Sequence, residues 1–190
     1  MSLVLLGILN SQAAAAGGAG AYDLLETQVL TSSASSVTFT GLGSYSDYKH
    51  LQLRCVLQDI QGSTNLNNGY IKLNNDTSSI YARHQLQGNG SSVSSNASSS
   101  QTSALFYDFF EDGGYPDRFG AAIFDILDFS STSKNTTIRG LGGAASRQYM
   151  IGLWSALYAS TSAITQLEIW SATNDVAAGS RFSLYGIKGA

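Results

Sequence analysis

Charged side chains are scarce in this chain: only 12% of its 190 residues are Asp, Glu, Lys or Arg, which is about half of the usual share. The net charge is −3, and the basic residues are scattered along the sequence. A protein that binds nucleic acid needs clustered basic side chains to neutralise phosphates. We therefore expect no nucleic-acid partner, and a weakly charged surface suited to packing against another protein or a sugar.

Cysteine and proline each occur once, as Cys55 and Pro116. A lone cysteine cannot form an intrachain disulfide, so cysteine usage does not indicate a redox compartment. Cys55 falls in an apolar alternation with Leu51, Leu53 and Leu57, which predicts a small buried hydrophobe. A chain of this length with 43% hydrophobic residues can bury enough surface to fold without a disulfide or a metal.

Residues that build metal or catalytic sites are also few. The two histidines, His50 and His84, lie on separate segments and lack the spacing of a metal site. Residues 74–77 offer oxygen ligands but lack the acidic spacing of a calcium loop. An Asx-type turn is the favoured interpretation there, with Ca²⁺ binding as the alternative. No serine-nucleophile or dinucleotide-binding motif has its required strand–turn–helix context. We predict a non-enzymatic protein without cofactor or metal.

Residues 108–128 are rich in acidic side chains and form the only charge-dense part of the sequence. Paired carboxylates can hydrolyse glycosidic bonds when their separation is suitable. Two of these acids, Asp125 and Asp128, have arginines for ion pairing, at Arg118, Arg139 and Arg147. Ion pairing is therefore the favoured interpretation, and glycan hydrolysis is the less favoured alternative.

From Tyr22 onward, hydrophobic and polar residues alternate with a period of two, which is typical of half-buried strands. Residues 22–31 also favour a strand over a helical turn, because Thr27 and Val29 are β-formers. The other predicted strands cover residues 37–40, 50–58, 70–73, 104–110, 121–129, 148–158, 164–170 and 181–187.

Glycine, asparagine and aspartate gather between these segments and predict turns, for example at residues 67–69 and at Gly142 and Gly143. Strands separated by such turns indicate an all-β fold. We predict a single antiparallel β-sandwich, jelly-roll-like, over residues 21–190. The Ser-rich residues 91–103 are expected to form a surface loop or an extended edge.

The first twenty residues differ from this body, because an apolar stretch is followed by alanines and glycines. No basic residue precedes the apolar stretch, which argues against a secretory signal. The stretch is also too short to span a bilayer, so we expect no membrane partner. We predict a short, extended apolar N-terminal arm over residues 1–20 that anchors the chain on a neighbouring subunit through an Ala/Gly linker. The alternative is a strand or turn of its own domain. The predicted particle-anchoring residues are Leu3, Val4, Leu5, Leu6, Ile8 and Leu9.

Aromatic residues give the clearest sign of binding, since the chain has ten tyrosines and most of them lie at or near strand ends and loops rich in Asn and Ser. Tyrosine is enriched at protein interfaces and on sugar-binding surfaces. The alternative is that most of them fill the ends of the core. The candidate interface residues are Tyr45, Tyr48, Tyr81, Tyr115, Tyr149 and Tyr158.

Several segments resemble phage virion structural proteins, chiefly from cyanobacterial and marine phages. They are MSLVLLGILNSQAAA at the start, residues 21–54, IYARHQLQGNGSS from Ile80, FDILDFSSTSKNTT from Phe124 and SRFSLYGIKG from Ser180. The resemblance implies a β-rich virion protein that is assembled in the host cytoplasm and contacts major capsid or tail proteins.

Two functions fit this resemblance. The first is a capsid decoration or cement subunit, which docks on the particle and stabilises it, as a homo-oligomer and, as the resemblance implies, a trimer. The second is a tail-fibre or receptor-binding module that recognises host surface polysaccharide. The short chain, the apolar anchor and the absence of a long fibrous shaft favour the first, whereas the Tyr- and Asn-rich loops favour the second.

Overall fold

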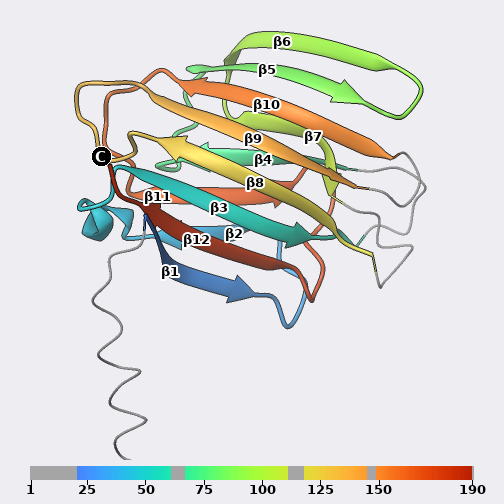
Figure 1. The fold of residues 1–190 in the computed structure, drawn as a ribbon, viewed down its shortest axis with the longest axis horizontal. Helices are drawn as coiled ribbons and strands as arrows, with labels where there is room; N and C mark the ends of the chain where they lie inside the picture. Colours follow the sequence, from blue (N-terminus) through green and yellow to red (C-terminus); the bar gives the residue numbers. More distant parts are fainter. Residues whose placement is uncertain (1–20, 61–66, 111–117, 145–148, 190) are drawn as a thin grey trace, which may run out of the picture.

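A computed structural model describes residues 21–60, 67–110, 118–144 and 149–189, with side chains unassigned at 107–110. The chain folds into two antiparallel sheets packed face to face, as Figure 1 shows. The larger sheet contains, in spatial order, β1 (Tyr22–Val29), β12 (Arg181–Ile187), β3 (His50–Leu57), β8 (Gly120–Leu127), β9 (Thr136–Ala144), β10 (Met150–Tyr158), β5 (Tyr81–Gly88) and β6 (Val93–Gln101). The smaller sheet contains β2 (Val37–Thr40), β11 (Gln166–Ser171), β4 (Asn67–Leu73) and β7 (Ala104–Phe110).

This architecture confirms the predicted all-β antiparallel sandwich. The helical structure among the described residues is a single 3-10 turn, η2 (Leu42–Tyr45). None of the described helices is long and apolar enough to cross a membrane. The predicted N-terminal arm and its boundary at residue 20 lie outside the described residues.

The core lies between the two sheets and is built by the predicted alternation. β10 is buried and exposed at successive residues along its whole length, with Trp154 on the buried face. Phe106 on β7 of the smaller sheet packs against Phe124 on β8, at 4.5 Å between ring centroids, and against Trp154 at 6.0 Å. These aromatic contacts join the two sheets through the middle of the core. Cys55 is buried in the same core, as predicted.

Two of the predicted turns are wrong. Gly142 and Gly143 lie inside β9, and residues 67–69 begin β4. Position 142 has no room for a side chain, because a Cβ there would lie only 2.7 Å from the Ala121 carbonyl oxygen on β8. The glycines of β9 therefore allow close packing of neighbouring strands, a use of glycine that resembles a turn signal in the sequence.

The Ser-rich residues 91–103 contain β6, an edge strand. Of the two predicted alternatives, the extended edge is therefore confirmed and the surface loop is not. The neighbouring strand β5 and strand β9 were missing from the predicted strands. β5 alternates weakly because both of its faces carry polar side chains, including Arg83, His84 and Gln85.

Candidate binding surface

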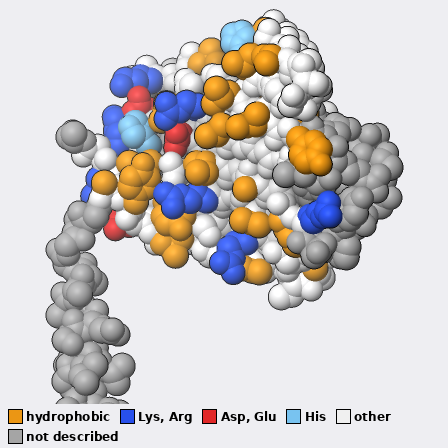
Figure 2. All heavy atoms as spheres, turned by 45° about the vertical axis from the view of Figure 1, so that its right-hand side comes forward, with side chains coloured by type: hydrophobic (Ala, Val, Ile, Leu, Met, Phe, Trp, Pro, Cys, Tyr) orange, Lys and Arg blue, Asp and Glu red, His pale blue; other side chains and the backbone are white. Residues whose placement is uncertain are grey.

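The outer face of the larger sheet points away from the smaller sheet and is exposed to solvent (Figure 1). Strand register places its side chains in rows that cross neighbouring strands. One row joins Ile123 on β8, Leu141 on β9, Leu153 on β10 and Leu86 on β5. These four side chains are 43–51% exposed. We call them the aliphatic row. Figure 2 shows hydrophobic side chains in several patches on the exposed surface, separated by polar and charged ones.

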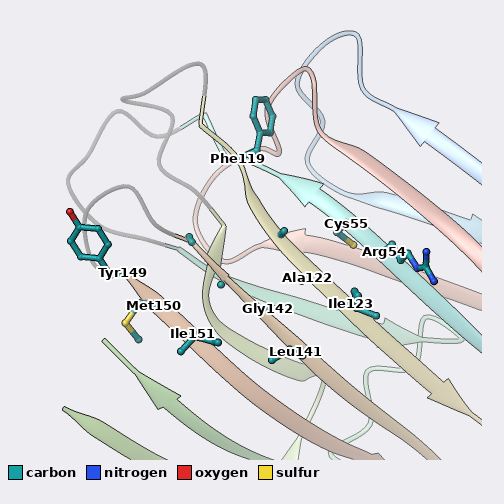
Figure 3. Close-up of a pocket in the computed structure, with 13 residues that line it drawn as sticks. Arg54, Cys55, Phe119, Ala122, Ile123, Leu141, Gly142, Tyr149, Met150 and Ile151 are labelled. Atoms are coloured by element: carbon teal, nitrogen blue, oxygen red, sulfur yellow. The ribbon is translucent and has the colours of Figure 1, made fainter. Parts of the chain in front are cut away.

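The next row alternates large and small residues. Its order is Val56, Ala121, Gly143, Ile151, Gly88 and Val93. The small residues leave two hollows beside the aliphatic row. A hollow of about 580 Å³ lies over Ala121 and Gly143, and one of about 260 Å³ lies over Gly88. Figure 3 shows Tyr149 and Arg54 on opposite sides of the larger hollow, with Ile151 and Leu141 between them.

A polar row follows on the other side of the aliphatic row. Arg54 Nε donates to Gln52 Oε1 at 2.8 Å, and Gln52 Nε2 donates to Asp125 Oδ1 at 2.8 Å. Arg139 Nη2 completes the chain with a 2.7 Å bond to Asp125 Oδ2. The Arg54 guanidinium also stacks 4.5 Å from the centroid of the Tyr185 ring. This network fixes the guanidinium of Arg139 and the carboxylate of Asp125 at the surface, while the Gln52 amide is buried.

A third hollow of about 350 Å³ lies between the polar and aliphatic rows, lined by both Asp125 and Leu153. The outer face therefore presents three hollows with apolar walls and a hydrogen-bonding border. Such a surface suits non-covalent binding of a partner rather than proton transfer.

The acidic residues in β8 and directly after it, Asp125 and Asp128, form ion pairs. Asp125 pairs with Arg139, as the sequence predicts. Asp128 pairs with Lys49 and Lys134, each at 3.2 Å, instead of the predicted arginines. Partial burial of Asp128 acts to raise its pKa, but the two ammonium groups outweigh burial and hold the pKa below its usual value. A carboxyl held ionised in this way is a poor general acid.

The segment 74–77 forms the predicted Asx-type turn. Asp76 Oδ1 accepts a 2.8 Å hydrogen bond from the Ser78 backbone N–H, and Asp76 Oδ2 accepts one from the Tyr158 hydroxyl at 2.8 Å. The hydrogen bonds from Ser78 and Tyr158 hold the pKa of Asp76 below its usual value. Asn74 Oδ1 accepts from the Thr165 backbone N–H at 2.7 Å. These oxygens therefore stabilise the loop itself.

The six candidate tyrosines fall into different places. Tyr81 and Tyr158 were wrongly assigned to an interface, because they are 0% and 2% exposed and stack against each other in the core. Tyr45 and Tyr48 are partly buried against the core. Tyr149 is 67% exposed and borders the larger hollow, so it fits the predicted surface role. Tyr115 lies outside the described residues.

The predicted anchoring residues, between Leu3 and Leu9, also lie outside the described residues. The aliphatic row is absent from the sequence-based candidates. The sequence of β10 indicates this row, because Ile151 and Leu153 are apolar although the opposite face of the strand already supplies the core. A strand that is apolar on both faces, in a sheet covered on one side, indicates an exposed apolar surface.

No protein-family model and no curated protein matches this chain. Among solved structures, exo-inulinase from Aspergillus awamori aligns with 12% identity and a TM-score of 0.43, over 87% of this chain and 29% of that chain. The CBM40 domain of the Ruminococcus gnavus IT-sialidase, bound to α2,3 sialyllactose, aligns with 6% identity and a TM-score of 0.36, over 85% of this chain and 91% of that domain. This chain thus spans less than a third of the exo-inulinase, and similarities this low carry no inference about ligand or activity.

Proposed function

We propose that this protein is a non-catalytic structural subunit of a phage particle, of the head decoration or cement type, which docks on another virion protein through the outer face of its larger sheet. One observation carries the proposal: four aliphatic side chains lie in register across adjacent strands of that face and are about half exposed. Soluble proteins rarely expose contiguous apolar surface unless it binds something.

The chemistry of the face favours a protein as the partner. Its exposed side chains are mainly aliphatic, such as Leu141 and Leu153, whereas sugars stack on aromatic rings. Protein interfaces combine an apolar centre with a polar rim. The aliphatic row and the two hollows beside it supply the centre, and the hydrogen-bonded chain from Arg54 to Arg139 supplies the rim. The hollows suit anchor side chains of a partner, which dominate binding energy in many interfaces.

The phage context comes from the resemblance of the sequence to virion proteins. On this proposal the protein resides in the virion, and several copies associate, with a trimer as the form that the resemblance implies. The apolar N-terminal arm provides a second attachment, through the residues from Leu3 to Leu9. Two weak attachments on one chain strengthen each other through effective concentration.

The second candidate function is recognition of host surface polysaccharide by a tail-fibre or receptor-binding module. The polar row favours it, because the planar groups of Asp125 and Arg139 border a hollow of about 350 Å³, and the amide of Gln52 hydrogen-bonds Asp125. Carboxylate, amide and guanidinium groups at fixed positions can hydrogen-bond sugar hydroxyls. On this alternative the aromatic residue Tyr185 would contribute to the same site.

The proposal is tested with phage particles that lack this subunit, mixed with purified full-length protein and sedimented. Leu153→Glu places a charge in the centre of the aliphatic row, and Ser155→Glu places the same charge on the same strand and face in the polar row. Loss of a central apolar anchor reduces affinity by about tenfold or more. We expect that reduction for Leu153→Glu and near-normal co-sedimentation for Ser155→Glu.

Further variants separate the contribution of the N-terminal arm from that of the outer face. Deletion of residues 1–12 should weaken attachment further, and a deleted protein that binds as well as the full chain would remove the anchor from the proposal. Equal binding by Leu153→Glu and wild type would exclude the outer face as the docking surface. Retention of wild-type protein on purified host polysaccharide, lost in Gln52→Ala but kept in Leu153→Glu, would favour the second function instead.

A further inference from the structure

Strand β6 forms one edge of the larger sheet and lacks the features that normally protect an edge. Figure 1 shows it at the margin of the sheet, beside β5. Its sequence, VSSNASSSQ, contains no charged residue and no proline. Natural edge strands usually carry lysine, proline or a bulge, because unpaired backbone N–H and C=O groups otherwise pair with another strand.

The opposite edge of the same sheet provides the contrast. β1 carries Asp23 and Glu26, and its register shifts between Leu24 and Glu26. β6 has its own irregularity only near its end, where Ser100 has a φ of 55° and the register shifts beside Ser98. The segment from Val93 to Ser98 pairs with β5 without interruption. One edge is thus protected by charge and a bulge, and the other presents a regular, uncharged strand.

β6 also contributes little to the folded chain. Most of its side chains are exposed, and its first residue, Val93, is 75% exposed. Small side chains such as Ser94 and Ser95 leave the backbone accessible from the side. A strand that buries so little apolar surface is held by its pairing with β5, and a second pairing partner would stabilise it.

We propose that β6 pairs antiparallel with β6 of a second copy of this chain, so that two eight-stranded sheets join into one continuous sheet. A two-fold axis through the edge makes the contact self-complementary. No residue of the strand carries a charge, so the strands themselves bring no like charges together. The cation of the neighbouring strand, Arg83 of β5, is hydrogen-bonded to Ser98 and Gln101 at the end of β6, away from Val93.

The pairing has a geometric consequence for the outer face. The two-fold axis is perpendicular to the joined sheet, so the outer faces of both copies point the same way. Val93 lies on the edge strand itself, and Leu86 lies one strand in from it, with Ser95 as its partner on β6. The two aliphatic rows therefore face the same way, one on each side of the serines at the junction. A two-fold contact also requires an even number of copies, so it would join trimers in pairs if the body is trimeric.

The experiment measures the molar mass of the full-length protein by light scattering and by sedimentation equilibrium, from low to high micromolar concentration. Ser95→Asp places two like charges near the axis, and Ser95→Lys does the same with the opposite sign. Ser155→Asp, on an exposed position of β10 away from the edge, is the matched control. Melting curves establish that each variant is folded.

We expect the wild type and Ser155→Asp to have twice the mass of either Ser95 variant at the same concentration. An equimolar mixture of Ser95→Asp and Ser95→Lys should recover the doubled mass, because opposite charges then meet across the axis. The inference fails if the wild type and both Ser95 variants have equal mass throughout the series, or if the mixture recovers nothing. Neither result involves a phage particle, so the outcome is independent of the proposed docking function.

Discussion

Phe124 on β8 and Gly140 on β9 are register partners, and the phenyl ring occupies the space where a side chain at position 140 would stand. A Cβ on Gly140 would lie 2.6 Å from Phe124 Cδ1 and 3.2 Å from Trp154 Cε3. Phe124 is fully buried and packs on Phe106, so its ring has little freedom to move. The absence of a side chain at Gly140 therefore makes room for the aromatic contacts that join the two sheets.

Gly140→Ala should destabilise the protein by about 1–3 kcal/mol, because it overpacks a filled core. For a chain of this size, each kcal/mol lowers the melting temperature by roughly 2–4 °C. Gly43→Ala is the control, since a Cβ there would meet only Thr165 Cγ2 at 3.8 Å. Thermal denaturation followed by circular dichroism measures both, and equal melting temperatures would show that the ring moves freely aside.

Tyr81→Phe should destabilise the protein by about 1–3 kcal/mol, because it leaves a buried N–H without its acceptor. The Tyr81 hydroxyl accepts a 2.9 Å hydrogen bond from the Leu73 backbone N–H, which anchors β4. Tyr149→Phe removes the same hydroxyl from a side chain that is 67% exposed, and we expect no change there. Urea denaturation of the two variants measures the change in unfolding free energy. A denaturation midpoint for Tyr81→Phe equal to that of the wild type would contradict the prediction.

The Cys55 thiol should resist modification in the native protein. Burial raises its pKa well above the usual value, which keeps it protonated and unreactive as well as inaccessible. With a thiol-reactive dye at pH 8, we expect no rapid reaction under native conditions and one thiol per chain after denaturation. Fast stoichiometric labelling of the folded protein would show that the core opens readily around β3.

Asp76 should make stability depend on pH in the acid range. Its folded-state pKa lies below the usual carboxyl value, so its contribution is complete above that value and disappears as the pH falls through the folded pKa. Asp76→Asn should lower stability by about 1 kcal/mol at neutral pH, a modest figure because the group is partly exposed.

The difference between wild type and Asp76→Asn should therefore shrink below about pH 4. Melting temperatures from pH 2.5 to 7 test this, with Asp47→Asn, on an exposed carboxyl, as the control. A difference that stays constant over this range would assign the effect to lost packing rather than to ionisation.

The sequence predicted those strands in which one face is apolar and the other polar. β2, β7 and β12 have the predicted bounds, because alternation and flanking turns agree there. β9 escaped prediction because its glycines are required by neighbours such as Phe124, which only the folded sheet brings next to them. β5 escaped because polar side chains occupy both faces near the sheet edge.

The binding surface was less predictable than the fold. Aromatic content drew attention to tyrosines, yet Tyr81 and Tyr158 point inward, and tertiary packing alone decides this. The aliphatic row consists of single residues from β5, β8, β9 and β10, separated by up to 67 positions between Leu86 and Leu153. Only strand order and register place them side by side, and neither follows from local pattern.

Strand β12 is the last of the described strands in the sequence, yet it lies between β1 and β3 within the larger sheet. The hydrogen bond between the hydroxyl groups of Thr27 on β1 and Ser183 on β12 spans a separation of 156 residues. A ribosome-bound chain therefore carries β1 and β3 without the strand that joins them until almost all of the described sequence has been made. Contacts of such long range slow folding, because a large loop must close first. The larger sheet can therefore be completed only after β12 has been synthesised. Until then, β1 and β3 remain unpaired on the sides that face β12 and are exposed to aggregation.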